Sequence, residues 1–109
     1  TVDACDTDIV CVENSRENAS INSVTFNELW EGSCQQSKKE YDVVVANIVA
    51  DVLTFIANDL KKALKPQGKL ILSGILDKYE NKVLKHYTDL QLLERIAQDE
   101  WVTLILSRP

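Results

Sequence analysis

The chain has 109 residues, of which 45% are hydrophobic and 27% are charged, the proportions of an ordinary globular protein with one core. Its formal net charge of -5 argues against a surface that binds nucleic acid, and no run of Lys or Arg contradicts this. The apolar runs are too short to cross a bilayer, and no secretory signal opens the sequence. We therefore expect no direct nucleic-acid partner and no membrane partner.

The cysteines, Cys5, Cys11 and Cys34, are odd in number and form no CxxC pair, so the sequence predicts neither a disulfide framework nor a metal site. We expect Cys5 and Cys11 to be small buried side chains, because free Cys usually behaves in this way. Free thiols fit a reducing, cytoplasmic location. The sequence has no Met and opens inside a strand-like segment, which predicts a piece of a longer protein.

The first part of the chain predicts a strand, a helix and a second strand. Residues 2–5 lean apolar and predict a short strand. Thr7 or Asp8 can cap a helix over Ile9–Ile21, because both side chains accept hydrogen bonds from free backbone N–H groups. Residues 24–30 alternate imperfectly and predict the second strand.

The strongest strand prediction covers residues 42–46. Residues 43–46 are apolar without polar alternation, which is typical of a strand that is covered on both faces in a parallel sheet. Helical spacing follows over residues 48–64. Pro66 and Gly68 are expected to end that helix.

The last part of the chain predicts a strand, a helix and a hairpin. Residues 69–73 predict another buried strand. Asp77 and Glu80 resemble a capping box in front of a helix. Residues 91–97 and Trp101–Ser107 predict two strands, and their short connection requires them to be antiparallel.

This order of elements predicts one α/β domain with a mostly parallel sheet and a closing antiparallel hairpin. In such sheets ligands bind just beyond the carboxyl ends of the strands, where Asp6, Ser33 and Asn47 are expected. Asp6 can accept hydrogen bonds from a ribose diol, or it can cap the following helix in place of Asp8. Ser33 and Asn47 can contact a ligand, or they can be turn residues that bond nearby backbone.

The remaining polar candidates favour structure over chemistry. His86, the only His, is expected on the surface near the carboxyl end of a helix. Trp101 lies in an apolar strand and is expected in the core. The sequence shows no Ser-His-Asp set, metal-ligand cluster or glycine-rich phosphate loop.

Several segments resemble a known family. DxDxVCVENSRENA, starting at Asp6, resembles the DxDPxAVxxARENA segment of class I methyltransferases that use S-adenosyl-L-methionine. Residues 42–50 (DVVVANIVA), 72–76 (LSGIL) and 100–106 (EWVTLIL) are similar to the PrmA family, the bacterial methyltransferases of ribosomal large-subunit protein eleven. The resemblance runs over most of the chain and is weakest over residues 24–40.

The resemblance implies a Rossmann-like class I methyltransferase sheet. It implies an enzyme that transfers methyl groups from S-adenosyl-L-methionine to amino groups of a ribosomal large-subunit protein. On this basis Asp6 is the ribose-binding acid, and Asn47 lies beside the methionine part of the cofactor and the incoming amine. Ser33 is the third residue that we expect near the cofactor.

The family's first strand, its glycine-rich loop and its amino-terminal substrate domain have no counterpart in the sequence. Without that strand, residues 2–5 and 43–45 would each have unpaired backbone groups, which are costly when buried and invite association when exposed. We therefore expect an upstream segment in the full protein, and we expect the isolated piece to be inactive and to repack or to pair with another copy. Two alternatives stay open: an amine methyltransferase with another acceptor, and a non-catalytic Rossmann-like module.

Overall fold

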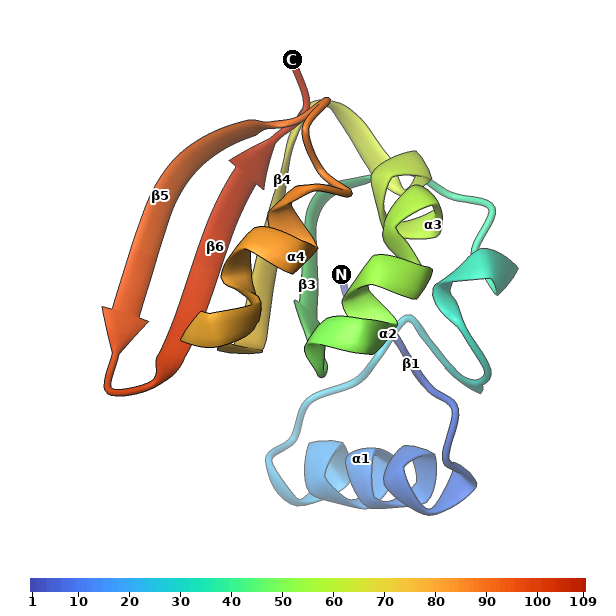
Figure 1. The fold of residues 1–109 in the computed structure, drawn as a ribbon. Coiled ribbons are helices and arrows are strands. Elements are labelled where there is room, and N and C mark those ends of the chain that lie inside the picture. The colour runs from blue at the N-terminus through green and yellow to red at the C-terminus, as the bar shows by residue number, and fades with distance from the viewer. The chain divides into compact units, whose positions relative to one another are not determined.

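The computed structural model describes residues 1–109, which form two compact units, Thr1–Ser37 and Lys38–Pro109 (Figure 1). The first unit contains β1 (Asp3–Asp6), α1 (Ile9–Ile21), β2 (Glu28–Glu31) and the 3-10 helix η1 (Cys34–Gln36). The second unit contains β3 (Tyr41–Asn47), α2 (Ala50–Phe55), α3 (Ala57–Lys62), β4 (Leu64–Leu76), the 3-10 helix η2 (Asp77–Tyr79), α4 (Glu80–Leu84), β5 (Gln91–Gln98) and β6 (Trp101–Ser107). None of these helices has the length and apolar character needed to cross a membrane.

The first unit is a parallel pair of strands connected by a helix. β1 and β2 pair in register from Asp3 opposite Glu28 to Asp6 opposite Glu31. The helix α1 has the predicted bounds, and the predicted side chain caps it, because Asp8 Oδ1 accepts a hydrogen bond of 2.9 Å from the Val10 N–H. β2 begins later than predicted.

The late start of β2 has a local cause. Ser23 adopts a positive φ of 56°, and the N–H of Val24 donates to the carbonyl of Ala19, so these residues belong to the turn that ends α1. The chain bends at Asn27, whose N–H donates to the Val2 carbonyl. The strand predicted over residues 24–30 therefore exists only from Glu28.

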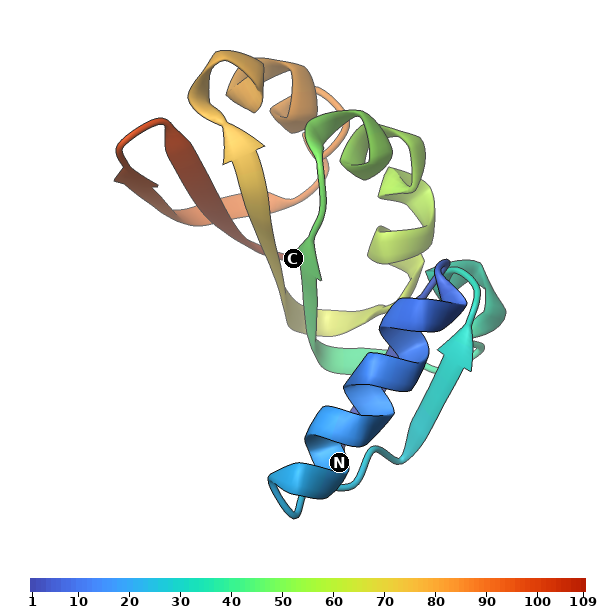
Figure 2. The same ribbon diagram turned by 90° about the horizontal axis from the view of Figure 1, so that it is seen from below.

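The second unit is a four-stranded sheet in the order β3-β4-β6-β5. β3 and β4 are parallel, whereas β4 with β6 and β5 with β6 are antiparallel, which confirms both the α/β class and the carboxyl-terminal hairpin. Helices α2, α3 and α4 cover one face of this sheet (Figure 1 and Figure 2). Most buried side chains of the two central strands face these helices; among them are Leu70, Leu72, Ile75, Val102, Leu104 and Leu106.

The prediction that β3 is covered on both faces is wrong for this chain. Val43 and Val45 are 53% and 65% exposed, whereas Ala46 is buried. Side chains alternate along a strand, and the helices of the second unit cover only one face. A continuous apolar run could not show which face would be covered.

The chain does not form one continuous sheet. β1 and β2 form a two-stranded sheet, and β3 is an edge strand of the four-stranded sheet. A single complete sheet would have contradicted the expected upstream strand, and it is not observed. The upstream strand and the self-association of the isolated piece stay predictions.

The helix predicted over residues 48–64 is two helices, α2 and α3, which meet at Ile56. No Gly or Pro marks this break. The Thr54 hydroxyl donates to the Asp51 carbonyl at 2.7 Å, a side-chain bond within the helix that tends to bend it. As predicted, the helical region ends before Pro66, with Ala63 as the carboxyl-terminal cap of α3.

Two other expectations for the second unit are wrong. Asp77 and Glu80 form no capping box, because α4 begins at Glu80 and its carboxylate instead accepts from Arg95 Nε at 2.7 and 2.9 Å. Trp101 is 49% exposed and not in the core. Its neighbour Val102 occupies the face that is covered by helices, so Trp101 lies on the opposite face.

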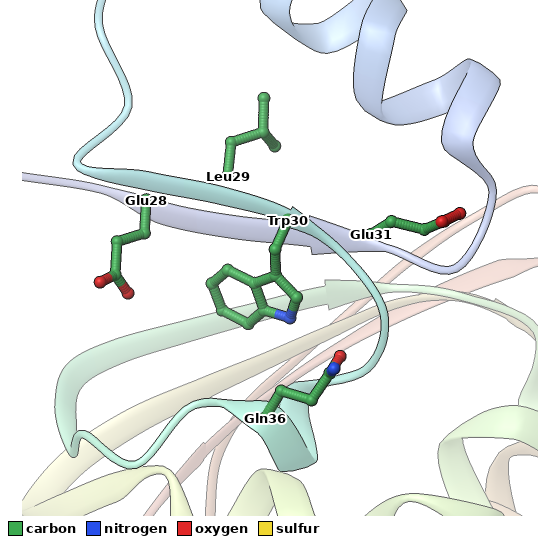
Figure 3. A pocket seen from close by; sticks show the side chains of 5 residues that line it. All are labelled: Glu28, Leu29, Trp30, Glu31 and Gln36. Carbon is green, nitrogen blue, oxygen red and sulfur yellow. The ribbon is translucent and has the colours of Figure 1, made fainter.

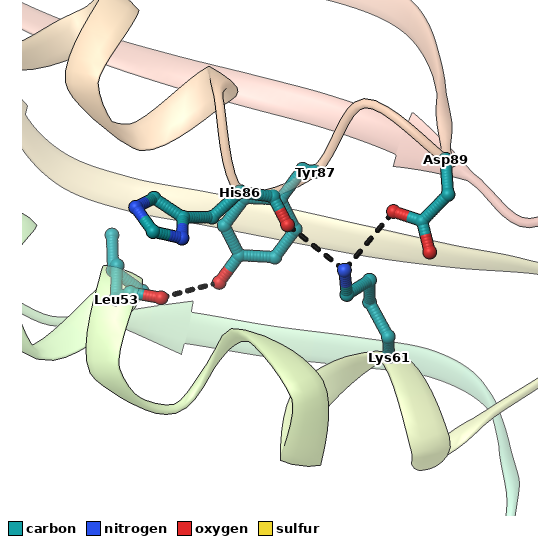
Figure 4. Close-up of polar contacts among 5 residues, drawn as sticks. All are labelled: Leu53, Lys61, His86, Tyr87 and Asp89. Carbon is teal, nitrogen blue, oxygen red and sulfur yellow. Dashed lines mark hydrogen bonds and ion pairs between the residues drawn. The ribbon is translucent and has the colours of Figure 1, made fainter.

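A polar cluster fixes the segment that follows α4 against the helices (Figure 4). The Tyr87 hydroxyl donates to the Leu53 carbonyl at 2.7 Å, in the last turn of α2, where carbonyls lack intrahelical partners. Lys61 Nζ donates to the His86 carbonyl at 2.9 Å and to Asp89 Oδ1 at 3.0 Å. The hydrogen bond from Lys61 lowers the pKa of the Asp89 carboxyl. His86 takes part here through its backbone, in agreement with its expected structural role.

Candidate functional site

Asp6 lies at the carboxyl end of β1 and is exposed. Its Oδ1 accepts from the Asp8 N–H at 2.9 Å, and its backbone carbonyl accepts from the Gly32 N–H at 2.8 Å. Asp8 caps α1, so the two acidic residues have different roles at the amino end of the helix. Asp6 therefore presents an exposed carboxylate at the carboxyl end of this strand.

The surroundings of this carboxylate are negative. Desolvation, followed by the charges of Asp6 and Asp8 and hydrogen bonds to them, raises the pKa of the Cys11 thiol. Desolvation and the charge of Asp6 also raise the pKa of Cys5. Both thiols therefore stay protonated at neutral pH. All three cysteines are free, and the expectation of burial is wrong for Cys11, which is exposed, while Cys5 is half-buried.

Ser33 lies just beyond β2, at the same end of the two-stranded sheet as Asp6. Its backbone N–H donates to Gln36 Oε1 at 3.0 Å, and its carbonyl accepts from Trp30 Nε1 at 3.2 Å. The backbone of Ser33 thus organises the turn into η1. The structure brings Asp6 and Ser33 to one edge of the sheet, and the contact of Ser33 with a cofactor stays a prediction.

An open pocket of about 470 Å³ lies along β2 (Figure 3). It is lined by Glu28, Leu29, Trp30, Glu31 and Gln36. The indole N–H of Trp30 is already bonded to the Ser33 carbonyl, so the pocket offers an apolar ring and carboxylates, and no free indole donor. The sequence contained no signal for this pocket, because its shape depends on the turn after β2.

Asn47 lies at the carboxyl end of β3 in the second unit and is exposed. It is opposite Ser73 of β4, and the Ile48 N–H donates to the Ser73 carbonyl at 3.3 Å. Because the two strands are parallel, their carboxyl ends meet at one edge. Gly74 follows Ser73 within β4 with a positive φ of 79°, a conformation that favours glycine, and the pairing of β4 with β6 is irregular between Leu72 and Ile75.

Each candidate residue is thus at the carboxyl end of a parallel strand or just after it, as the sequence predicted. Asp6 and Ser33 belong to the first unit, and Asn47 belongs to the second. No group of three or more His, Cys, Asp or Glu side chains is arranged to hold a metal ion.

The fold defines the class of protein. The structure resembles the crystal structure of ribosomal protein L11 methylase from Lactobacillus delbrueckii subsp. bulgaricus with a TM-score of 0.94 and 26% sequence identity. The match covers 99% of this chain and 57% of that one. The chain therefore has the Rossmann-like methyltransferase fold.

The sequence gives the family. The profile of the family described as "Ribosomal protein L11 methyltransferase (PrmA)" matches residues 1–109, and the chain belongs to this family. It is 53% identical over 96% of its length to the ribosomal protein L11 methyltransferase of a Nitratiruptor species, and 48% identical over 95% to that of Campylobacter concisus. The chain spans 37% and 38% of the length of these relatives.

Proposed function

We propose that this chain is part of the catalytic domain of an enzyme that transfers methyl groups from S-adenosyl-L-methionine to amino groups of ribosomal protein L11. The observation that carries the proposal is the family match over all residues 1–109, which include the three predicted site residues. The names of the similar proteins support the acceptor. A ribosomal-protein substrate implies a cytoplasmic location. The first strand and the glycine-rich loop are proposed to come from residues before Thr1.

The polar groups of the first unit fit the cofactor chemically. A carboxylate at the end of a strand can accept two hydrogen bonds from a ribose diol, and Asp6 is exposed at such a position. Its Oδ1 is oriented by the Asp8 N–H. Ser33, at the same edge, is proposed as a second contact. The cofactor, when bound, supplies a methyl group that is already activated by its positively charged sulfur.

Asn47 is proposed to orient the acceptor amine. Its side-chain oxygen can accept an amine N–H, and its exposure leaves it accessible. The amine must arrive neutral, with its lone pair directed toward the methyl carbon, so this hydrogen bond would set the direction of attack. An acceptor oxygen also stabilises the positive charge of the ammonium product. Because positioning is the main requirement, no general base of the conventional kind is needed.

The role of Asp6 is tested by calorimetric titration of the full-length protein with S-adenosyl-L-methionine. Asp6→Ala should weaken binding by about 1.5–3 kcal/mol, the value of hydrogen bonds to a charged group. Asp8→Asn is the matched control. It removes the charge of the neighbouring acidic residue but keeps a side-chain oxygen that can cap α1, so cofactor binding should not change. Normal cofactor binding by Asp6→Ala would remove the ribose assignment.

The role of Asn47 is tested by methyl transfer to purified ribosomal protein L11. Asn47→Ala should lower kcat, whereas Asn58→Ala, an exposed Asn on α3, should leave it unchanged. Unchanged turnover in Asn47→Ala would exclude this residue from the mechanism. Methylation of another amine in place of L11 would favour the alternative acceptor, and a full-length protein that does not bind the cofactor would favour a non-catalytic module.

A further inference from the structure

Gly74 lies against the side chain of Asn47. The two residues are on neighbouring strands, because Asn47 pairs with Ser73 of β4 and Gly74 is the next residue of that strand. A Cβ atom added at Gly74 would be 2.6 Å from Asn47 Oδ1. It would also be 3.4 Å from the Ile48 carbonyl oxygen and 3.5 Å from the Ile48 nitrogen, which are ordinary contacts. The space that a side chain at position 74 would need is thus the space that the Asn47 oxygen occupies.

The backbone at this point favours glycine for a second, independent reason. Gly74 has a φ of 79°, where residues with a side chain are strained. Strain at Gly74 would not depend on which residue is at position 47. The contact with Oδ1, in contrast, exists only while Asn47 is present. These two effects can therefore be separated by experiment.

We propose that Gly74 is a positioning residue, because its missing side chain leaves free the space in which the Asn47 carboxamide takes the direction that the reaction requires. Asn47 is exposed, so few other groups limit its rotamers. A side chain at position 74 would turn Oδ1 away from its present position. This inference rests on the proposed function of Asn47 in orienting the acceptor amine.

The test is a double-mutant cycle in the full-length enzyme, with kcat, KM and the urea midpoint of unfolding measured for Gly74→Ala, Asn47→Ala and the double variant. Gly74→Ala should lower kcat by about 10- to 100-fold, the cost of a small misplacement of a catalytic group. In the Asn47→Ala background the same change should alter kcat by less than about twofold, because coupling is lost with the contact. Gly74→Ala should also lower the urea midpoint less in the Asn47→Ala variant than in the wild-type enzyme.

Gly68→Ala is the matched control on the same strand. A Cβ at Gly68 would be 2.8 Å from the Lys65 carbonyl oxygen. This variant therefore introduces a steric clash with the backbone in a part of β4 that is distant from Asn47. It should lower the urea midpoint and leave kcat unchanged. Gly74→Asn is a second test variant, because Asn tolerates positive φ better than Ala and still adds a Cβ. It should lower kcat even if Gly74→Ala folds poorly.

The outcomes separate the two proposals. Normal kcat in both Gly74→Ala and Gly74→Asn, or an equal loss of kcat in both backgrounds, overturns the positioning role of Gly74. Unchanged kcat in Asn47→Ala overturns the proposed function of Asn47 itself, and the urea cycle then shows whether the contact between the two residues exists.

Discussion

In the first unit only Val12 is a buried hydrophobic side chain, whereas the second unit contains all the others. A two-stranded sheet with one helix cannot enclose a core, but four strands covered by three helices can. The first unit is instead held by polar contacts, such as the Asp8 cap of α1 and the hydrogen bond of 2.8 Å from Asn27 Nδ2 to Asp3 Oδ1. The same family fold thus combines a core-stabilised part with a part that depends on individual hydrogen bonds.

The largest effect is expected in the core of the second unit. Leu72→Ala removes a fully buried side chain of β4 and should lower the free energy of unfolding by about 2–5 kcal/mol, through lost burial and the cavity that remains. Urea unfolding of the full-length protein measures this change. Leu92→Ala, on the 42% exposed Leu of β5, should cost far less, and equal costs would contradict the assigned core.

A smaller effect is expected for the buried residue of the first unit. Val12→Ala should cost about 1.5 kcal/mol, the value of two buried methylene-sized groups. Hydrogen exchange of the α1 amides reports this unit separately. Val10→Ala, at a position 61% exposed on the same helix, should leave the exchange almost unchanged. If Val12→Ala destabilised its unit as much as Leu72→Ala destabilises the second unit, the two units would not differ in their dependence on buried side chains.

The cap of α1 should contribute about as much as a buried side chain of that unit. Asp8→Ala should destabilise the helix by about 1 kcal/mol, because the Val10 N–H loses its acceptor. Faster exchange of the first-turn amides of α1 measures the loss. Asp8→Asn should retain most of the protection, and equal exchange in both variants would show that the cap is not important.

Tyr87→Phe should cost about 1 kcal/mol in the second unit, because the Leu53 carbonyl loses a buried hydrogen-bond donor. This cost is small compared with the stabilisation that the core gives to the second unit. A hydrogen bond of the same value is a larger part of the stabilisation of the first unit. Urea unfolding measures the change. Tyr79→Phe is the control, since Tyr79 is 40% exposed, and it should be neutral.

The smallest effect concerns pH. Lys61 lowers the pKa of Asp89 in the folded state, so the folded protein binds fewer protons than the unfolded chain near the ordinary carboxyl pKa. The stabilisation is present above that pKa and is lost as the pH falls through the lowered value. Asp89 is largely exposed, so the effect is small. Asp89→Asn should flatten the decrease in stability below about pH 4, and an unchanged slope would contradict the assignment.

Local signals were sufficient for much of the fold. The bounds of α1 follow from Asp8 and from the polar residues after Ile21, and the hairpin follows from a connection too short for any other pairing. The break at Ile56 could not be predicted, because neither Gly nor Pro marks it in the sequence.

Burial was harder to predict than secondary structure. The exposure of Val43 and Trp101 depends on which sheet face the helices cover, and a strand's own residues do not carry that information. The same limit applies to the candidate site. The positions of Asp6 and Asn47 at strand ends could be predicted from the sequence, whereas the contact of Gly74 with Asn47 depends on the pairing of β3 with β4.

β4 pairs with β3 on one side and with β6 on the other, and its register against β6 shifts between Leu72 and Ile75. Pairing with β6 resumes at Ile75 opposite Val102, so the positive φ of Gly74 falls inside the irregular part of the strand. Natural insertions and deletions should therefore be more common in the turn at Asp99 than within β4 between Lys69 and Ser73, where the strand has a neighbour on each side. A one-residue deletion there would shift the register of the strand, so that its buried leucines would point to the opposite, uncovered face. The same shift would move Ser73 out of its position opposite Asn47.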